Sequence, residues 1–341
     1  MRSLHEVIDE IAQDGKPVTR KIIDKLLRTC IKQKDVAVAK RLHTVMVSSQ
    51  HVESALADQL IRFFLFNACL AEAKAVLDNI PSPAVHTWHA IISAYSEGGE
   101  KLQALNLYHR MQRQALVMPN AYIFSCVLKA CSGLHDLLQG ALTHSDAIIM
   151  SLESDNVVGT ALVDLYCKCK RMFEAFSVFE NIKSCNVITW NALLTGCVQN
   201  QQWVLTLSLF DQLQQEGVKP DRVTFLCIMK ACGSLGSFER CKLLYVQIRE
   251  IGLVSDVIVS NALIGMFAKS GELQQANEVL KILQVRDVVS WTSIIAGFVQ
   301  HGHGFAALEA FIKMQQEGIR PEKGIHNKRI AFRLSFAFKG C

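Results

Sequence analysis

The chain has 341 residues, of which 50% are hydrophobic and 20% charged, and its formal net charge is +5. This apolar content can bury a large core and excludes a chain that is disordered throughout. The modest positive charge permits a polyanionic partner without requiring one. With only 6 prolines and 19 glycines, no linker or low-complexity stretch separates globular domains, which favours a repeat architecture.

The N-terminal segment, residues 1–19, does not have the composition of a targeting signal. It carries four acidic residues, Glu6, Asp9, Glu10 and Asp14. It lacks both the apolar core of a secretory signal and the acid-poor, Arg-rich character of a transit peptide. We therefore expect no transit peptide in this chain. Because no window reaches 18 apolar residues, we also expect no membrane span.

The 12 cysteines lie mostly among apolar residues, and no C-x-x-C motif occurs. This pattern predicts small buried side chains in a reducing compartment. Cys167 and Cys169 are the one close pair, and too few further ligands lie nearby to complete a metal site. We predict neither a metal nor a cofactor.

Three residue types recur at intervals of about 101 residues, which indicates a large repeat present three times. The sets are Trp88, Trp190 and Trp291; Cys30, Cys131 and Cys232; and Pro119, Pro220 and Pro321.

A finer period lies inside each large repeat, where a small residue before an apolar pair recurs every 31 to 36 residues. It divides the chain into nine units: 20–53, 54–84, 85–120, 121–155, 156–186, 187–221, 222–256, 257–287 and 288–322. Periods of this length are typical of solenoids, in which no unit buries its apolar face alone. Residues 323–341 abandon the pattern, and we expect them to form an atypical, disordered tail.

Each unit has the pattern of two amphipathic helices, which unit 187–221 shows most clearly. The apolar residues over 190–197 have the i, i+3, i+4, i+7 spacing of one helix. A second pattern begins with Val204, runs over 204–214 and stops at Gly217, a helix stop signal. The predicted fold class is all-α, a solenoid of helix–turn–helix repeats.

Several segments resemble the pentatricopeptide repeat family, and specifically its plant subclass that alternates long, short and standard motifs. They are VITWNALLTGCVQN (187–200), GVKPD (217–221), VIVSNALIGMFAKSGELQQANEVL (257–280), VVSWTSIIAGFVQHG (288–302) and, for the long motif, VLKACSGLHDLLQG (127–140). Tetratricopeptide repeats also form helical hairpins, but their uniform 34-residue period does not match the alternation here.

The resemblance implies a right-handed superhelix whose first helices line a groove. It further implies binding of single-stranded RNA in plant mitochondria or chloroplasts, roughly one base per repeat. A role in organellar RNA processing follows, with specification of C-to-U editing sites as one form of it. A deaminase or another processing factor would then act in trans.

In that family, base choice is attributed to the fifth and last residues of each unit, and the second residue packs on the base. Carried over, the resemblance gives adenine for Thr160 with Asn186, uracil for Asn191 with Asp221 and for Asn261 with Asp287, and guanine for Ser125 with Asp155. The packing residues are Val157, Ile188 and Ile258. Long units follow the scheme poorly, and the base for Thr292 with Glu322 is not given.

The residue chemistry is compatible with this scheme. An Asn amide offers a donor and an acceptor to a pyrimidine edge, and a β-branched side chain presents a stiff apolar surface. A simpler alternative makes Asp221 and Asp287 helix N-caps and leaves Asn191 and Asn261 as first-turn residues with solvent-facing amides. Recurrence of the Asn–Asp combination favours recognition. The repeated tryptophans are expected to be core anchors and not base-stacking platforms.

No catalytic motif stands out. The chain has no phosphate loop, no G-x-S-x-G and no dinucleotide fingerprint. A zinc deaminase requires H-x-E with C-x-x-C; His51-Val52-Glu53 fits the first element inside a repeat, and the second is missing. We therefore predict a binding protein and no enzyme. A protein-binding helical scaffold and a truncated, inactive repeat product remain open as alternatives.

Overall fold

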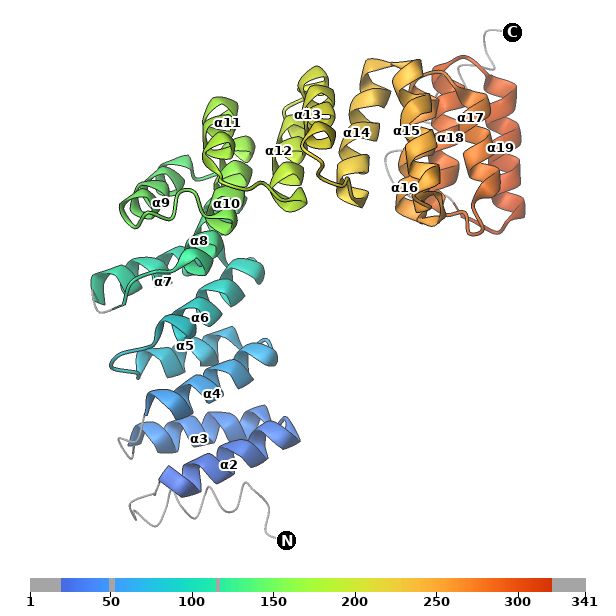
Figure 1. Cartoon of the computed structure of the whole chain (residues 1–341). Helices are drawn as coiled ribbons and strands as arrows, with labels where there is room; N and C mark the ends of the chain where they lie inside the picture. Colours follow the sequence, from blue (N-terminus) through green and yellow to red (C-terminus); the bar gives the residue numbers. More distant parts are fainter. Residues whose placement is uncertain (1–19, 49–52, 115–116, 321–341) are drawn as a thin grey trace. The chain divides into compact units, whose positions relative to one another are not determined.

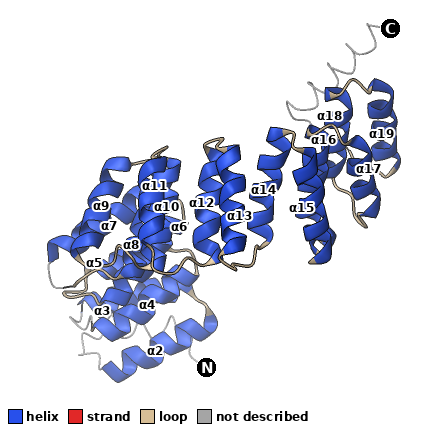
Figure 2. Ribbon diagram, turned by 45° about the horizontal axis from the view of Figure 1, so that its top comes forward, coloured by secondary structure: helices blue, strands red, loops and turns tan. Residues whose placement is uncertain are grey.

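The computed structural model describes residues 20–48, 53–114 and 117–320 (Figure 1). All regular structure in these ranges is helical, as Figure 2 shows, so the predicted all-α class is confirmed. No helix in the described ranges has the length and apolarity needed to cross a membrane. The N-terminal segment 1–19, the tail 323–341, Pro321 and Glu322 lie outside the described residues.

The described helices fall into pairs joined by short turns. The first helices are α2 (Arg20–Gln33), α4 (Ser54–Phe66), α6 (Val85–Glu97), α8 (Ala121–Leu134), α10 (Asn156–Lys168), α12 (Val187–Gln199), α14 (Arg222–Leu235), α16 (Val257–Lys269) and α18 (Val288–Gln300). The second helices are α3 (Val36–Ser48), α5 (Leu70–Asp78), α7 (Lys101–Gln114), α9 (Leu137–Ile149), α11 (Met172–Asn181), α13 (Trp203–Gln215), α15 (Phe238–Glu250), α17 (Leu273–Ile282) and α19 (Gly304–Gln316). A short 3-10 turn, η1 (Leu253–Ser255), precedes α16.

The described residues form two lobes, which are distinguished by their internal contacts. One lobe holds the described residues up to 169 together with 180–183, and the other holds 170–179 together with 184–320. Within each lobe, a first helix packs against its own second helix and against the next first helix. In one lobe α8 packs on α6 and α10, and in the other α16 packs on α14 and α18. Inside a lobe, consecutive first helices therefore form a row, and the seam between two of them joins one unit to the next.

The repeated tryptophans anchor these helices. Trp88 and Trp190 are fully buried and Trp291 nearly so, which confirms their predicted place in the core. Helix α13 differs from expectation at one residue, because Val204 is exposed and the buried face runs through Leu207, Leu209, Phe210 and Leu213.

Backbone geometry explains how each hairpin turns. In every described turn between a first and a second helix, one residue has a positive φ. Glycine occupies four of these positions, whereas Lys34, Ala68, His135, Lys170 and Gln201 occupy the other five. Gly217, with φ +72°, ends α13 as predicted, and the amide of Val218 then donates to the carbonyl of Leu213 at 3.2 Å.

The cysteines are small core residues, as expected. Those in the described residues are free thiols, and most of them are buried, including Cys131, Cys197 and Cys232. Cys167 is buried and Cys169 half-buried. No group of three or more His, Cys, Asp or Glu side chains in the described ranges is arranged to hold a metal ion.

Candidate nucleic-acid interface

The last residue of a unit is the N-cap of the first helix of the next unit. Asp155 caps α10, Asn186 caps α12, Asp221 caps α14 and Asp287 caps α18, and each side chain accepts a backbone amide from the first turn. These bonds satisfy amide groups that have no partner inside the helix. The capping interpretation is therefore confirmed for Asp221 and Asp287, and Asp155 and Asn186 cap their helices in the same way.

Asp221 also binds a side chain of its own unit, which lies on the preceding first helix. The Nδ2 of Asn191, on α12, donates to Oδ1 of Asp221 at 2.9 Å. In the same way, Nδ2 of Asn261, on α16, donates to both carboxylate oxygens of Asp287 at 3.1 Å. Each aspartate thus caps one helix and holds an asparagine on the neighbouring one. The alternative that placed both asparagine amides in solvent is wrong.

A threonine completes the first of these pairs. Thr224, on the first turn of α14, lies with its Oγ1 2.6 Å from Oδ1 of Asn191. A carboxylate only accepts hydrogen bonds, so Asn191 must direct its Nδ2 toward Asp221, and the Thr224 hydroxyl must donate to its Oδ1. Both ends of the Asn191 carboxamide are therefore engaged, and this residue is only 7% exposed.

The second pair lacks this third contact. Ser290 is the residue of α18 that corresponds to Thr224, and its hydroxyl lies 2.9 Å from both the backbone O and Oδ1 of Asp287. Oδ1 of Asn261 is buried and has no hydrogen-bond partner. A buried acceptor left unsatisfied costs about 1–3 kcal/mol, so the two pairs differ energetically despite their identical sequence.

The aspartates remain charged down to low pH. Burial acts to raise the pKa of Asp221, but the amide of Thr224, the carboxamide of Asn191 and the Thr224 hydroxyl outweigh it and lower the pKa. The same balance lowers the pKa of Asp287, with Ser290 and Asn261 as donors. Hydrogen bonds to the charged form favour ionisation, so both pairs present a carboxylate at neutral pH.

Apolar side chains lie beside these pairs. Val157, Ile188 and Ile258, the second residues of their units, are 39%, 65% and 52% exposed. Residues three apart on a helix are surface neighbours, so Ile188 lies next to Asn191 and Ile258 next to Asn261.

Sequence analysis missed three equivalent residues. Tyr122, Val223 and Val289 are also second residues of their units, and they are exposed too. Extending the repeat register to every unit would have identified them. Tyr122 contacts the ring of His89, the fifth residue of the preceding unit, at 5.8 Å between centroids.

The remaining predicted residues are not joined in the same way. The hydroxyls of Thr160 and Thr292 donate to carbonyls of their own helices, at 2.6 Å from Asn156 O and 2.7 Å from Val288 O. In the described part of the chain, buried Ser125 makes no hydrogen bond to Asp155.

For two of the predicted pairs, the two residues are not both described within one lobe. Thr160 and Asn186 belong to different lobes, and Glu322, the partner assigned to Thr292, lies outside the described residues. Their pairings stay predictions.

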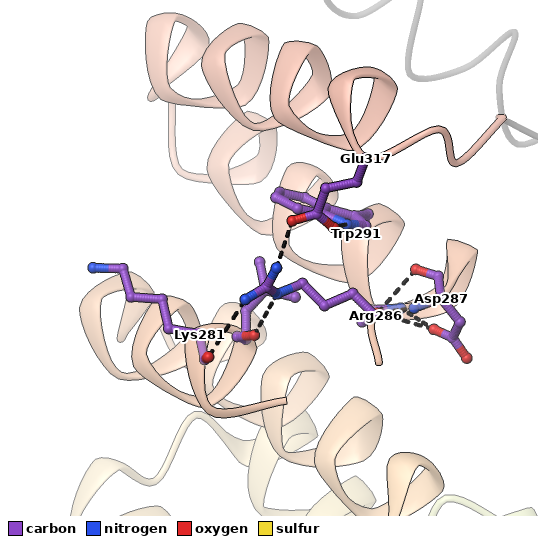
Figure 3. A network of polar contacts seen from close by, with 7 residues as sticks. Lys281, Arg286, Asp287, Trp291 and Glu317 are labelled. Atoms are coloured by element: carbon purple, nitrogen blue, oxygen red, sulfur yellow. Dashed lines mark hydrogen bonds and ion pairs between the residues drawn. The ribbon is translucent and has the colours of Figure 1, made fainter. Parts of the chain in front are cut away.

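A second polar network involves Arg286, the residue before Asp287 (Figure 3). Arg286 donates through Nε to the carbonyl of Leu280 at 2.9 Å, and its guanidinium forms an ion pair with Glu317. The other carboxylate oxygen of Glu317 accepts the indole N–H of Trp291 at 3.1 Å. This network ties the end of α17 to α18 and α19, and no motif in the sequence indicated it.

Models of one repeat family match more than half of the chain. The PPR repeat family model matches residues 185–234, and the PPR repeat model matches 86–115, 160–187, 223–253, 258–288 and 289–319. The matched segments are repeats, and none of them is a catalytic domain.

Curated relatives include three proteins from Arabidopsis thaliana. Pentatricopeptide repeat-containing protein At1g03540 is 29% identical over 93% of this chain and 52% of its own length. The mitochondrial protein At2g03880 is 29% identical over 93% of this chain and 49% of its own length. The chloroplastic protein At1g11290 is 31% identical over 87% of this chain and 37% of its own length. The chain thus spans about half or less of the length of these relatives.

Solved structures agree with the fold. The crystal structure of the pentatricopeptide repeat protein PPR10 in complex with an 18-nt PSAJ RNA element superimposes with a TM-score of 0.70 and 18% identity, covering 98% of this chain and 50% of that one. The crystal structure of PPR10 from maize superimposes with a TM-score of 0.53 and 18% identity, covering 98% of this chain and 59% of that one. Repeat-model matches, relatives and fold lead to one conclusion: the chain belongs to the pentatricopeptide repeat family.

Proposed function

We propose that the chain binds single-stranded RNA sequence-selectively, with one base per repeat. The observation that carries this proposal is the hydrogen-bonded Asn–Asp pair beside an exposed β-branched side chain, present in units 187–221 and 257–287. Such a pair can meet the Watson–Crick edge of a base while the apolar side chain packs on its face. The similar fold of PPR10, which has been solved with an RNA element, supports the proposal.

The two Asn–Asp units are assigned to uracil. A held carboxamide offers both an N–H donor and a carbonyl acceptor, and the uracil edge has an N–H between two carbonyls. Thr160 with Asn186 is assigned to adenine and Ser125 with Asp155 to guanine, both by family resemblance. Unit 222–256, with Leu226 in fifth place, is left unassigned.

The biological role follows from the family. We propose a sequence-selective adaptor in organellar RNA processing, including the specification of C-to-U editing sites, with a deaminase or another processing factor supplied in trans. Relatives named mitochondrial and chloroplastic support an organellar location. Unit lengths that alternate between 31 and about 35 residues support the plant subclass with long, short and standard motifs.

The test is a competition binding assay with the full chain and short RNA probes. A probe carrying A-U-x-U, 5′ to 3′ across units 156–287, is expected to bind more tightly than its scrambled form. Affinity is also expected to fall with salt, because each phosphate contact contributes about −0.7 to the log–log slope. Equal binding of both probes would reject sequence selectivity. Absence of RNA binding would reject the function and leave the protein-binding scaffold as the alternative.

A further inference from the structure

The sequence gives the two Asn–Asp units the same specificity, but their third partners differ. Thr224 and Ser290 occupy the same place, three residues after the aspartate, and both are fully buried. Both also close a capping box with that aspartate, because the backbone amide of Asp221 donates to Thr224 Oγ1 at 3.2 Å and that of Asp287 donates to Ser290 Oγ at 2.8 Å. Their role in the helix cap is therefore shared.

Only Thr224 reaches the asparagine of the preceding unit. Its single hydroxyl proton has two acceptors within reach, Oδ1 of Asn191 at 2.6 Å and Oδ1 of Asp221 at 3.1 Å, and the shorter contact is to Asn191. Its γ-methyl group also restricts χ1, which keeps the hydroxyl directed at the seam between α12 and α14. Ser290 has no such restriction, and its hydroxyl is turned toward Asp287.

We propose that Thr224 is a positioning residue for base selection, which fixes the Asn191 carboxamide through its carbonyl while Asp221 fixes it through its amide. This inference rests on the proposed function. The consequence is a rigid pattern of donor and acceptor in unit 187–221 and a less constrained one in unit 257–287. Asn261 is held at its nitrogen alone, so its carbonyl can shift to suit the base.

A rigid carboxamide discriminates better between pyrimidines. Cytosine presents an acceptor at N3 and an amino donor at C4, where uracil presents a donor and an acceptor. An amide that can tilt about its nitrogen tolerates the wrong base at a lower cost, whereas a pre-organised one disfavours that base more strongly. Unit 187–221 should therefore reject cytosine more strongly than unit 257–287.

The experiment measures binding of the full chain to probes with U or C at the nucleotide of one unit at a time. Thr224→Ala should lower the U-over-C ratio at the nucleotide of unit 187–221 about fivefold, the factor that corresponds to one hydrogen bond. Ser290→Ala is the matched control, because it removes the same capping-box hydroxyl, and its ratio at the nucleotide of unit 257–287 should stay unchanged. Thr224→Ser, which restores the hydroxyl, should recover most of the discrimination.

The outcomes separate the two levels of the proposal. If the wild-type chain prefers uracil and Thr224→Ala leaves the U-over-C ratio unchanged, the role of Thr224 is overturned and the proposed function is not. An equal loss in Ser290→Ala would also overturn it, because the effect would then belong to the helix cap. Wild-type chain without RNA binding would overturn the proposed function itself.

A second measurement needs no RNA. In solution NMR of the free wild-type chain, the side-chain amide of Asn191 should be more ordered than that of Asn261. Thr224→Ala should bring Asn191 to the level of Asn261. Equal order of the two amides in the wild-type chain would contradict the proposal, whether or not the variants fold.

Discussion

Trp190 and Trp291 lie 101 residues apart in the sequence and at the same place in their units, yet their indole groups differ. The N–H of Trp291 donates to Glu317, which Arg286 holds by an ion pair. The N–H of Trp190 is buried and has no hydrogen-bond partner.

The residues that surround the two tryptophans differ. The counterpart of Glu317 near Trp190 is Glu216, but the counterpart of Arg286 is Cys185. Cys185 lies 3.9 Å from the carbonyl of Phe179, as Arg286 contacts the equivalent carbonyl of Leu280. Burial, and after it the charge of Glu216, raises the pKa of the Cys185 thiol. No guanidinium directs Glu216 toward the indole, and its Oε1 instead accepts a hydrogen bond from Nε2 of Gln212 at 3.1 Å.

Removing either ring should have the largest effect. Both Trp190→Ala and Trp291→Ala should cost about 3–5 kcal/mol, because loss of buried ring packing dominates at both sites. Repeat arrays open segment by segment, so the measurement is hydrogen exchange of the α12 and α18 amides. Val204→Ala, at an exposed position of α13, is the control and should change stability by less than about 0.5 kcal/mol. A small effect at one tryptophan would mean that its ring does not anchor the unit.

Replacing each tryptophan by phenylalanine should separate the sites. Both changes remove similar volume, but Trp291→Phe also removes a hydrogen bond to a charged group, whereas Trp190→Phe removes an unsatisfied donor. Trp291→Phe should therefore be the more destabilising by about 1–2 kcal/mol, again by local hydrogen exchange. Equal costs would show that the Glu317 contact adds nothing to stability.

Cys185→Arg should transfer the network of Figure 3 to the Trp190 site. The new guanidinium can reach the carbonyl of Phe179 and pair with Glu216, which would then accept the indole N–H. We expect a gain of up to about 1 kcal/mol, because one unsatisfied donor is paired at a partly exposed position. Cys185→Ala provides the control without a charge. A gain of the same size in Cys185→Ala would contradict the transfer.

The smallest expected effect is a loss of stability in acid. Asp221 and Asp287 have lowered pKa values in the folded chain, so their contribution is complete above the unfolded value of about 3.9 and disappears as pH falls through the folded one. Asp221→Asn keeps a capping oxygen and should flatten this dependence around α14. Circular dichroism and hydrogen exchange between about pH 2 and 6 measure the dependence of stability on pH. If Asp221→Asn has the same acid profile as the wild-type chain, the Asp221 carboxylate does not contribute to the loss.

The helical pairs could be predicted because the information is local. The i, i+3, i+4 spacing around Trp190, the stop at Gly217 and the period of about 101 residues each indicate a structure by themselves. The Asn–Asp pairing was expected from family resemblance, and the capping role from the preference of aspartate for helix N-termini. Sequence analysis set capping and recognition against each other, whereas the structure shows that capping α14 does not prevent Asp221 from also binding Asn191.

The rest depends on side-chain directions across the seams. The sequence does not predict that the Thr224 hydroxyl turns toward Asn191 and the Ser290 hydroxyl toward Asp287, because the χ1 rotamer of each residue determines the contact. The contact of Trp291 with Glu317 likewise depends on Arg286, a residue outside every motif. The contact of Thr224 with Asn191 joins residues 33 positions apart, and that of Trp291 with Glu317 joins residues 26 apart. Pattern analysis within one helix does not examine such distances.

The most direct test exchanges the polar pair of one unit for that of another. Asn191→Thr combined with Asp221→Asn gives unit 187–221 the Thr–Asn pair assigned to adenine, and competition binding would then be measured with all four bases at its nucleotide. The preference is expected to move from uracil to adenine at that nucleotide and to stay the same at the others. Persistence of the uracil preference, or an equal loss of affinity for every probe, would contradict base reading by these residues.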